Sequence, residues 1–464
     1  MEEINNDVAT EKKTNIEKNI VSAIDIGTTK IVAIVGEKIE DGKLKILGMG
    51  TSPSTGVKRG VVQNIQMTVQ SISAAVSIAE EQSGYKFKDV FVGIAGQHIR
   101  STEQSHQIPR SDFESEITHL DIDKLKEAMY SMPVEPGEEI IHVVPKNFIV
   151  DNEFGVEPLG MCGKLLVGTY HIVIGQVTSA NDIKRCIERV DITTRDLILE
   201  PLASAHAVLT DEEKEVGVAL VDIGGGTTDI AVYKDNRIVH TAVIPFGGDV
   251  ITKDIKEAYN IVEKSAEKLK VLKGSALSDV IKPNEYVSIE GINGRAAKEI
   301  SVRNLAYIIN CRMDEIVDRL FLEISNHIDI EKLGAGIVLT GGGALLKNIT
   351  QFIAYKTGLD IRIGLPNQLL FTDLDKTLNK TKYATAIGLI MGGFDIINEN
   401  EKRLTFEQLT LNKKTPEIIE EKEEEKEEEK EIIKDKKPKI PFGERLKKGL
   451  INVFTEESED KKLE

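Results

Sequence analysis

Hydrophobic residues near the start of the chain fall into short runs that turn residues separate. The run from Val21 to Ile26 is apolar and rich in β-branched residues, and Gly27 and two threonines separate it from a second run, Ile31 to Val35. Such runs predict two strands joined by a tight turn. A third strand is expected from Leu44 to Met49, after an Asp-Gly pair that favours a hairpin turn. From Val62 to Ala79 the apolar residues recur at helical spacing, which predicts a helix.

The same arrangement returns about two hundred residues later. An apolar run from Val218 to Ile223 leads into the turn GGGTTD, Gly224 to Asp229, and strand patterns follow at Ile230 to Tyr233 and at Arg237 to Ile244. A repeat of strand, glycine-threonine turn and strand predicts two similar α/β halves that face a shared ligand.

Two segments interrupt this repeat and predict small inserted domains. Asp89 to Val167 lacks a glycine-threonine turn and has short strand patterns around a helical pattern at Ile122 to Met129. Val250 to Ser301 begins with a charged helical pattern. We therefore expect the first half to comprise residues 20–88 and 168–199, and the second half to comprise residues 200–249 and 302–397, after a flexible arm over residues 1–19.

The composition narrows the function classes. There are 59 Lys and Arg residues against 76 Asp and Glu residues, a net charge of −17, which excludes a nucleic-acid partner held by bulk electrostatics. Hydrophobic residues make up 41% of the chain and charged residues 29%, as in a globular protein. The three cysteines are far apart and have no CxxC spacing, so we expect neither disulfides nor a cysteine zinc site, and we expect buried thiols.

The two glycine-threonine turns predict a nucleotide site. A triphosphate needs several backbone N–H donors at close range, and only residues without a Cβ let the backbone approach it that closely. A carboxylate before each turn, Asp25 and Asp222, could hold Mg²⁺ through water, and Lys30 could add a positive charge. Either turn alone is equally well explained as an ordinary hairpin, but the pair favours ATP and Mg²⁺ as cofactors. The predicted phosphate donors are Gly27, Thr28, Thr29, Gly224, Gly225, Gly226, Thr227 and Thr228.

A third glycine run and one glutamate complete the candidate set. The apolar strand pattern GIVLTGGG ends in Gly341, Gly342 and Gly343, whose backbone could approach an adenine and a ribose, and a helix is expected from about Ala344. Glu200 lies between the two turns and could orient water toward a γ-phosphate. A helix-capping or surface glutamate is the alternative. No P-loop, GxGxxG or HExxH motif occurs.

These motifs resemble a known superfamily. DIGTTK, DIGGGTTD and TGGG resemble the actin and heat-shock ATPase superfamily, and EPLASAHAVL, PFGGDVITKDI, GMCGKLLVGTYHIV and VGIAGQHI resemble its FtsA family of bacterial cell-division proteins. The resemblance covers about residues 20–395 and the terminal helix. It implies an α/β, actin-like fold of two related halves around a cleft that binds ATP, with the inserted domain replacing the usual second subdomain. It adds Gly248, Glu267 and Lys270 as nucleotide contacts, places Glu200 near the attacking water, and implies at most a weak ATPase.

The carboxyl-terminal segment has a different pattern. A charged linker is expected over residues 398–438, since residues 417–431 hold ten Glu and three Lys. Residues 439–454 form a basic amphipathic pattern that predicts a helix lying on anionic membrane lipid, with docking on a protein as the alternative. An acidic tail, residues 455–464, follows. The membrane residues are Phe442, Arg445, Leu446, Lys447, Lys448, Leu450, Val453 and Phe454.

The resemblance also implies the partners and the location. Family members assemble on themselves and tether FtsZ to the cytoplasmic face of the cell membrane at the division site, as peripheral proteins, and other division proteins bind the inserted domain. The FtsZ C-terminal peptide docks on the second small domain, where Lys298, Arg303 and Arg312 are candidate contacts because an acidic peptide needs cations. A small-molecule kinase of the same superfamily and a pilus-assembly adaptor are the alternatives.

Overall fold

The computed structural model describes residues 19–403 apart from 40–42, 156, 292, 294, 367–369 and 371–377. Residues up to Glu399 form one compact unit, and a second unit begins at Asn400. The predicted N-terminal arm, most of the linker, the amphipathic helix and the acidic tail lie outside the described residues.

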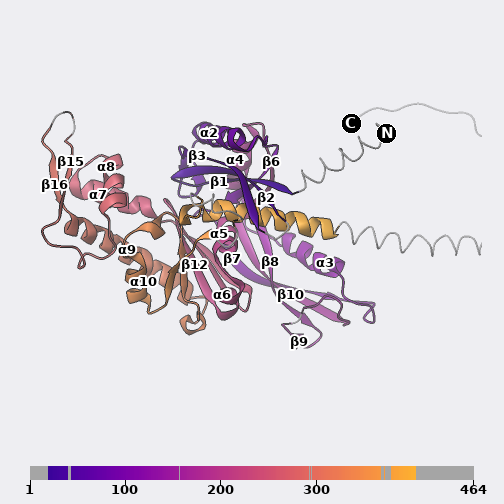
Figure 1. Ribbon diagram of the computed structural model, residues 1–464. Coiled ribbons are helices and arrows are strands. Elements are labelled where there is room, and N and C mark those ends of the chain that lie inside the picture. Colours follow the sequence, from indigo (N-terminus) through magenta and orange to yellow (C-terminus); the bar gives the residue numbers. More distant parts are fainter. Residues whose placement is uncertain are drawn as a thin grey trace, which may run out of the picture. The chain divides into compact units, whose positions relative to one another are not determined.

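The first half is built on a five-stranded sheet. Its strands, in spatial order, are β11 (Thr193–Leu199), β6 (Asp89–Ile94), β1 (Ile20–Ile26), β2 (Lys30–Lys38) and β3 (Leu44–Pro53). The first three strands in this order run parallel, and β2 and β3 continue as antiparallel neighbours. The helices α2 (Ile65–Ser83) and α4 (Val177–Glu188) lie side by side at the top of Figure 1 and bury their apolar residues with the sheet in one core cluster. A short hairpin, β4 (Val57–Lys58) and β5 (Val61–Val62), precedes α2.

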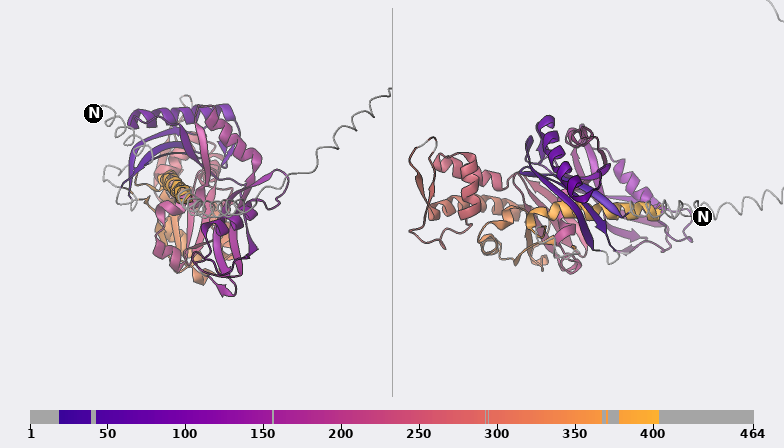
Figure 2. Two further views of the ribbon diagram at one scale, coloured as in Figure 1. Left: turned by 90° about the vertical axis from the view of Figure 1, so that its right-hand side faces the viewer. Right: turned by 45° about the horizontal axis from the view of Figure 1, so that its top comes forward.

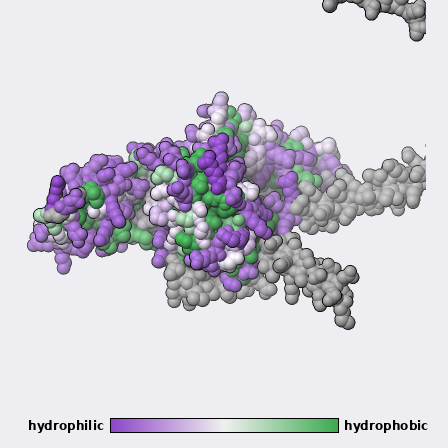
Figure 3. All heavy atoms as spheres, turned by 90° about the horizontal axis from the view of Figure 1, so that it is seen from above, coloured by the Kyte–Doolittle hydropathy of each residue, from purple (hydrophilic) through white to green (hydrophobic). Residues whose placement is uncertain are grey.

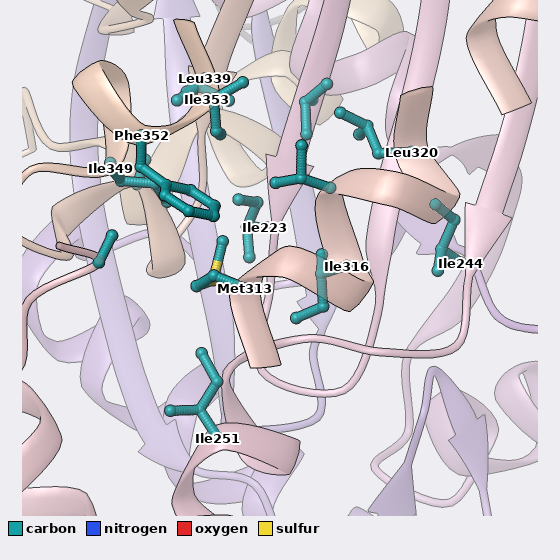
Figure 4. Packing of buried hydrophobic residues seen from close by; sticks show 14 of the residues in the cluster. Ile223, Ile244, Ile251, Met313, Ile316, Leu320, Leu339, Ile349, Phe352 and Ile353 are labelled. Atoms are coloured by element: carbon teal, nitrogen blue, oxygen red, sulfur yellow. The ribbon is translucent and has the colours of Figure 1, made fainter. Parts of the chain in front are cut away.

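The second half repeats this topology, which confirms the two related α/β halves. Its strands, in spatial order, are β14 (Arg237–Ile244), β13 (Thr228–Lys234), β12 (Val218–Ile223), β17 (Ile337–Thr340) and β18 (Ile361–Ile363). The largest core cluster packs this sheet against α9 (Val302–Ser325) and α10 (Ile349–Thr357). Figure 4 shows Ile223, Met313 and Phe352 of this cluster close together.

Two helical segments fill the space between the sheets. The segment 384–399 is helical, and α5 (Glu200–Val208) begins directly after β11. Both contribute to one buried cluster that includes residues of both sheets, such as Val32 and Leu220. The segment 384–399, seen end-on in the left view of Figure 2, passes between the strands of the two sheets. The two halves therefore share a continuous apolar core. The short helix α6 (Asp211–Val216) connects α5 to β12.

The first inserted domain has its own sheet and core. It contains β7 (Arg100–Pro109), β8 (Glu138–Val150), β9 (Glu153–Phe154), β10 (Leu165–Gln176) and the helix α3 (His119–Tyr130). The strand order is β7-β10-β8-β9, and one face packs on α3. The observed limits differ from the expected 89–167. Strand β6 pairs in the first core sheet, and β10 continues in the inserted sheet beyond Val167.

The second small domain lies at the left of Figure 1. It contains α7 (Gly248–Tyr259), α8 (Glu263–Lys273) and the hairpin of β15 (Tyr286–Ile289) and β16 (Lys298–Ser301), which leads into α9. The helix expected from Ala344 is wrong. Gly343–Leu345 forms a 3-10 turn, and Lys347 pairs with Ser275 in an isolated β-bridge, so α10 begins only at Ile349. Two further 3-10 turns occur, at Ile330–Lys332 and Thr381–Tyr383.

The surface is mainly polar. Hydrophilic residues cover most of the face shown in Figure 3, and hydrophobic residues appear there in smaller groups. Within the described ranges, no helix is long and apolar enough to cross a membrane. The expectation of three buried thiols is wrong, because Cys162 and Cys311 are exposed and only Cys186 is buried.

Candidate functional site

A cavity of about 450 Å³ lies where the two halves meet. Its volume is in the range of small-molecule sites. Both glycine-threonine turns and the third glycine run line it, and so does Glu200. Thr228 is the exception among the predicted phosphate donors: it begins β13, and its hydroxyl donates to the Phe246 carbonyl at 2.8 Å. The predicted residues that line the cavity are Asp25, Gly27, Thr28, Thr29, Lys30, Glu200, Asp222, Gly224, Gly225, Gly226, Thr227, Gly248, Glu267, Lys270, Gly341, Gly342 and Gly343.

The two turns face each other at contact distance. A Cβ at Gly225 would lie 1.9 Å from the hydroxyl oxygen of Thr29, and a Cβ at Gly226 would lie 2.6 Å from that of Thr28. Both positions therefore require glycine for this close approach. The backbone N–H of Gly60, in the hairpin before α2, donates to the Thr28 hydroxyl at 3.2 Å. The backbone groups of both turns are thus brought to one small volume.

The third glycine run packs on the second turn. Strands β12 and β17 are parallel, with Asp222 opposite Thr340, so the residues after both strands meet. Gly341 has a φ of +84°, and a Cβ there would lie 2.2 Å from Oδ1 of Asp222. A Cβ at Gly343 would lie 2.3 Å from Cγ2 of Ile223. Ile223, which is 2% exposed, therefore contacts Gly343 through its side chain and Gly341 through its backbone carbonyl.

Three aspartates are buried at the bottom of the cavity. Asp25 and Asp222 are 6% exposed and Asp229 is 5% exposed. The Ser204 hydroxyl donates to Oδ2 of Asp222 at 2.8 Å, and Nζ of Lys30 lies 3.8 Å from Oδ2 of Asp25. Burial raises the pKa of Asp25 and of Asp222, and Lys30 only partly offsets this for Asp25. Lys30 therefore does not neutralise the negative charge of these buried carboxylates.

Asp229 was not selected from the sequence as a site residue. It is the last residue of GGGTTD, and its spacing from Asp222 on the antiparallel strand was the available signal. Its Oδ1 is buried and has no hydrogen-bond partner, and burial followed by the charge of Asp222 raises its pKa well above the usual range. An unsatisfied buried carboxylate oxygen is costly. It fits a site for a hard divalent cation such as Mg²⁺ and its bound waters.

Glu200 is the first residue of α5 and points into the same volume. Its side chain lines the cavity, and the residue in the N-cap position of α5 is Leu199. Burial raises the pKa of Glu200 well above its usual range, and the charges of Asp25, Asp229 and Asp222 raise it further. A carboxyl group with a raised pKa can hold or accept a proton near neutral pH.

Glu267 and Lys270 lie on one face of α8. Nζ of Lys270 is 2.7 Å from Oε2 of Glu267, as their spacing predicts, and it donates to the Gly248 carbonyl and the Thr252 hydroxyl at 2.8 Å each. These contacts fix the side of the cavity next to α7. Asp249, which the sequence analysis did not select, also lines this side.

The three partner-peptide candidates lie away from the cavity, and each has an intramolecular contact. The Lys298 ammonium donates to the Tyr259 carbonyl. Arg312 donates to Asp254 at 2.5 and 3.0 Å and to Glu315 at 2.6 Å. The Arg303 guanidinium lies 3.7 Å from Asp279, and both side chains are largely exposed. Arg303 is therefore more available for a new contact than Arg312.

Comparison with known proteins places this geometry in a family. The chain is 38% identical over 376 residues to the cell division protein FtsA of Neisseria meningitidis, covering 81% of this chain and 90% of that protein. The chain belongs to the FtsA family of cell division proteins. It is also 32% identical over 401 residues to FtsA of Escherichia coli, covering 84% of this chain and 94% of that protein. Membership of the FtsA family argues against both the kinase and the pilus-adaptor alternatives.

Two family models match parts of the chain, and a solved structure has the same fold. The model "Cell division protein FtsA" matches residues 219–388, and "SHS2 domain inserted in FTSA" matches residues 96–174. The second range agrees with the observed inserted sheet better than the expected 89–167. The solved PilM-PilN type IV pilus biogenesis complex has the same fold, with a TM-score of 0.57 at 13% identity, covering 81% of this chain and 98% of that one.

Proposed function

We propose that this FtsA family member binds ATP together with Mg²⁺ in the cavity between its two sheets. One observation carries the proposal: three glycine runs and a group of buried carboxylates, one with an unpartnered oxygen, converge on a single cavity. Asp25 and Asp222 would hold the ion through water, and Mg²⁺ would supply the positive charge that offsets the phosphates. The turns would donate backbone N–H groups to the phosphates, and Gly341 to Gly343 would face the adenosine.

Glu200 would act on water at the γ-phosphate, and the family resemblance implies at most a weak ATPase activity. Its raised pKa and its place among three aspartates suit a group that orients water and accepts a proton. The bound nucleotide would act mainly as a structural and assembly ligand.

Titration with a fluorescent ATP analogue, with Mg²⁺ and with EDTA, tests the site. The variant Asp222→Asn should bind at least about ten-fold more weakly in Mg²⁺, because the carboxylate that holds the hydrated ion is lost. The control Asp235→Asn changes an exposed aspartate in the turn between β13 and β14 and should bind as the wild type does. Equal affinity of Asp222→Asn in both conditions would contradict the proposal.

We further propose that the second small domain binds the C-terminal peptide of FtsZ. This domain and α9 expose several large hydrophobic side chains, and Arg303 lies among them. Exposed apolar residues beside a cation suit a peptide that is both acidic and apolar. The exposed residues near Arg303 are Val280, which follows its ion-pair partner Asp279, Tyr286, which pairs with Ser301, and Tyr307 on α9.

Peptide binding measured by fluorescence anisotropy tests this surface. Arg303→Glu should weaken binding of an FtsZ C-terminal peptide about ten-fold, since a charge reversal replaces an attraction by a repulsion. Arg185→Glu is a matched control, because Arg185 also lies in an exposed helical ion pair, on α4. If both variants bind the peptide equally well, Arg303 is not a contact.

Attachment to the membrane is proposed through residues 439–454. The proposal rests on the amphipathic, basic sequence pattern and on the family. Its test is co-sedimentation with anionic liposomes of the full chain and of a chain ending at Pro438, and equal pelleting would refute it. The full chain would then lie as a peripheral protein on the cytoplasmic face of the membrane at the division site, where the first inserted domain would contact other division proteins.

Self-assembly is the remaining part of the proposal. Electron microscopy of the full chain on anionic lipid, with ATP and with ADP, should show membrane-bound double filaments that require ATP. Their absence under both conditions would contradict assembly driven by the nucleotide.

A further inference from the structure

A cluster of two histidines and a glutamate lies far from the cavity, where three parts of the fold meet. His240 is on β14, and Glu323 and His327 lie at the end of α9. One ligand atom from each residue lies within 4.8 Å of the others. In the described part of the chain, this is the one group of three histidine, cysteine or acidic side chains with that spacing. We propose that it binds Zn²⁺ or a similar late first-row divalent ion.

His240 has a hydrogen-bond partner at each ring nitrogen, and one of these partners is Glu323. Its Nδ1 lies 3.4 Å from the Ser101 hydroxyl, which itself donates to the Thr241 carbonyl at 2.7 Å and so can accept the Nδ1 proton. Its Nε2 lies 2.9 Å from Oε1 of Glu323. Without a metal, Nε2 can carry the proton and donate it to Glu323. With the proton on Nδ1 instead, Nε2 and the Glu323 carboxylate are both able to bind a cation. This is the second-shell arrangement common around metal-bound histidines.

His327 has the complementary arrangement. Its Nδ1 lies 2.9 Å from the Glu323 carbonyl, to which it can donate, and this leaves Nε2 with a free lone pair. Its ring stacks on that of His240, with centroids 3.4 Å apart and planes 8° apart. The stack places both rings beside the carboxylate of Glu323.

Metal binding requires one side-chain movement. A metal lies in the plane of each imidazole that binds it, so the ring of His327 must turn out of the stack. Its side chain is 40% exposed and can do so, whereas that of His240 is 10% exposed and is held by Ser101. The negative end of the α9 dipole also favours a cation here. Lys146 is the nearby positive charge, and its ammonium is paired with Glu103.

Two imidazoles and a carboxylate suit zinc, with water in the remaining position. The bound ion would join β14 to α9, and through Ser101 it would support the contact of the first inserted domain with the second sheet. His171 of that domain, whose Nε2 lies 2.8 Å from the Thr241 hydroxyl, packs edge-on against His240. The site would therefore stabilise the position of the inserted domain independently of nucleotide.

Titration of the full chain with Co²⁺, a spectroscopic substitute for Zn²⁺, tests the site. Excess Mg²⁺ is present throughout so that sites made only of oxygen ligands are occupied. The wild type should give an intense visible d–d absorption that Zn²⁺ abolishes. His327→Ala and Glu323→Gln should lose it, and Ser101→Ala should bind Co²⁺ about ten-fold more weakly.

A matched control and a second measurement keep the test decisive. His106→Ala changes an exposed histidine of β7 outside the cluster and should retain the absorption. Zn²⁺ should raise the thermal midpoint of the wild type and of His106→Ala but not that of His327→Ala. The proposal is overturned if the wild type shows only the weak spectrum of hydrated Co²⁺, or if His327→Ala and Glu323→Gln bind Co²⁺ as tightly as the wild type.

Discussion

Ile223→Ala should separate the support of the candidate site from general stability. Ile223 is 2% exposed, belongs to the core cluster of the second half, and its side chain contacts the position of Gly343. The change removes three carbon atoms, each worth about 0.8 kcal/mol of burial, and leaves a cavity, so we expect a loss of about 2–5 kcal/mol in the free energy of unfolding. Gly343, which rests on the Ile223 side chain at the cavity, should also lose its fixed position, and ATP affinity should fall about ten-fold, or about 1.4 kcal/mol.

Ile316→Ala is the matched control. Ile316 is also 2% exposed and belongs to the same cluster, but it is on α9 and does not line the cavity (Figure 4). Urea unfolding gives the stability of both variants, and titration with a fluorescent ATP analogue gives their affinity under conditions in which both are folded. Both should lose similar stability, while only Ile223→Ala should lose affinity. Equal affinity of the two variants would refute the idea that Ile223 positions Gly343.

Three further predictions follow from the same region. Gly341→Ala should weaken ATP binding at least about ten-fold in the same titration, because a Cβ would lie 2.2 Å from Asp222 at a φ that disfavours alanine, and normal binding would show that the turn relaxes freely. Glu200→Gln should slow single-turnover ATP hydrolysis about 100-fold with little change in affinity, and a large affinity loss would instead make Glu200 a binding residue. His142 accepts a hydrogen bond from the Leu199 N–H at 3.0 Å, and burial lowers the pKa of His142 from its ordinary value of 6.5 to about 4. The contribution of neutral His142 to stability is therefore present above pH 6.5 and is lost as the pH falls toward 4, by up to about 1.4 kcal/mol per pH unit. In urea unfolding over this pH range, the free energy of unfolding of His142→Gln should depend less steeply on pH than that of the wild type.

The sequence alone predicted the local parts of the candidate site well. The strand patterns of Val218 to Ile223 and Arg237 to Ile244 coincide with β12 and β14, because short runs rich in apolar and β-branched residues are typical of strands in a buried sheet. The boundary at Asp89 was misplaced because β6 pairs with β1 and β11, and which strands pair does not follow from the pattern of one strand. The helix start near Ala344 failed for a similar reason, since Lys347 pairs with the distant Ser275.

The sequence by itself determined those features of the site that depend only on residues adjacent along the chain. Glycines that permit close backbone approach, threonines beside them and an aspartate before each turn form a pattern that can be read from residue order. What the tertiary structure decided is which charges share one buried volume. The raised pKa of Glu200 depends on Asp25, Asp222 and Asp229, and the cluster of His240, Glu323 and His327 depends on the packing of β14 against α9. Interactions between buried charges and the coordination of a metal depend on distances of a few ångströms in space, and separation along the chain does not predict these distances.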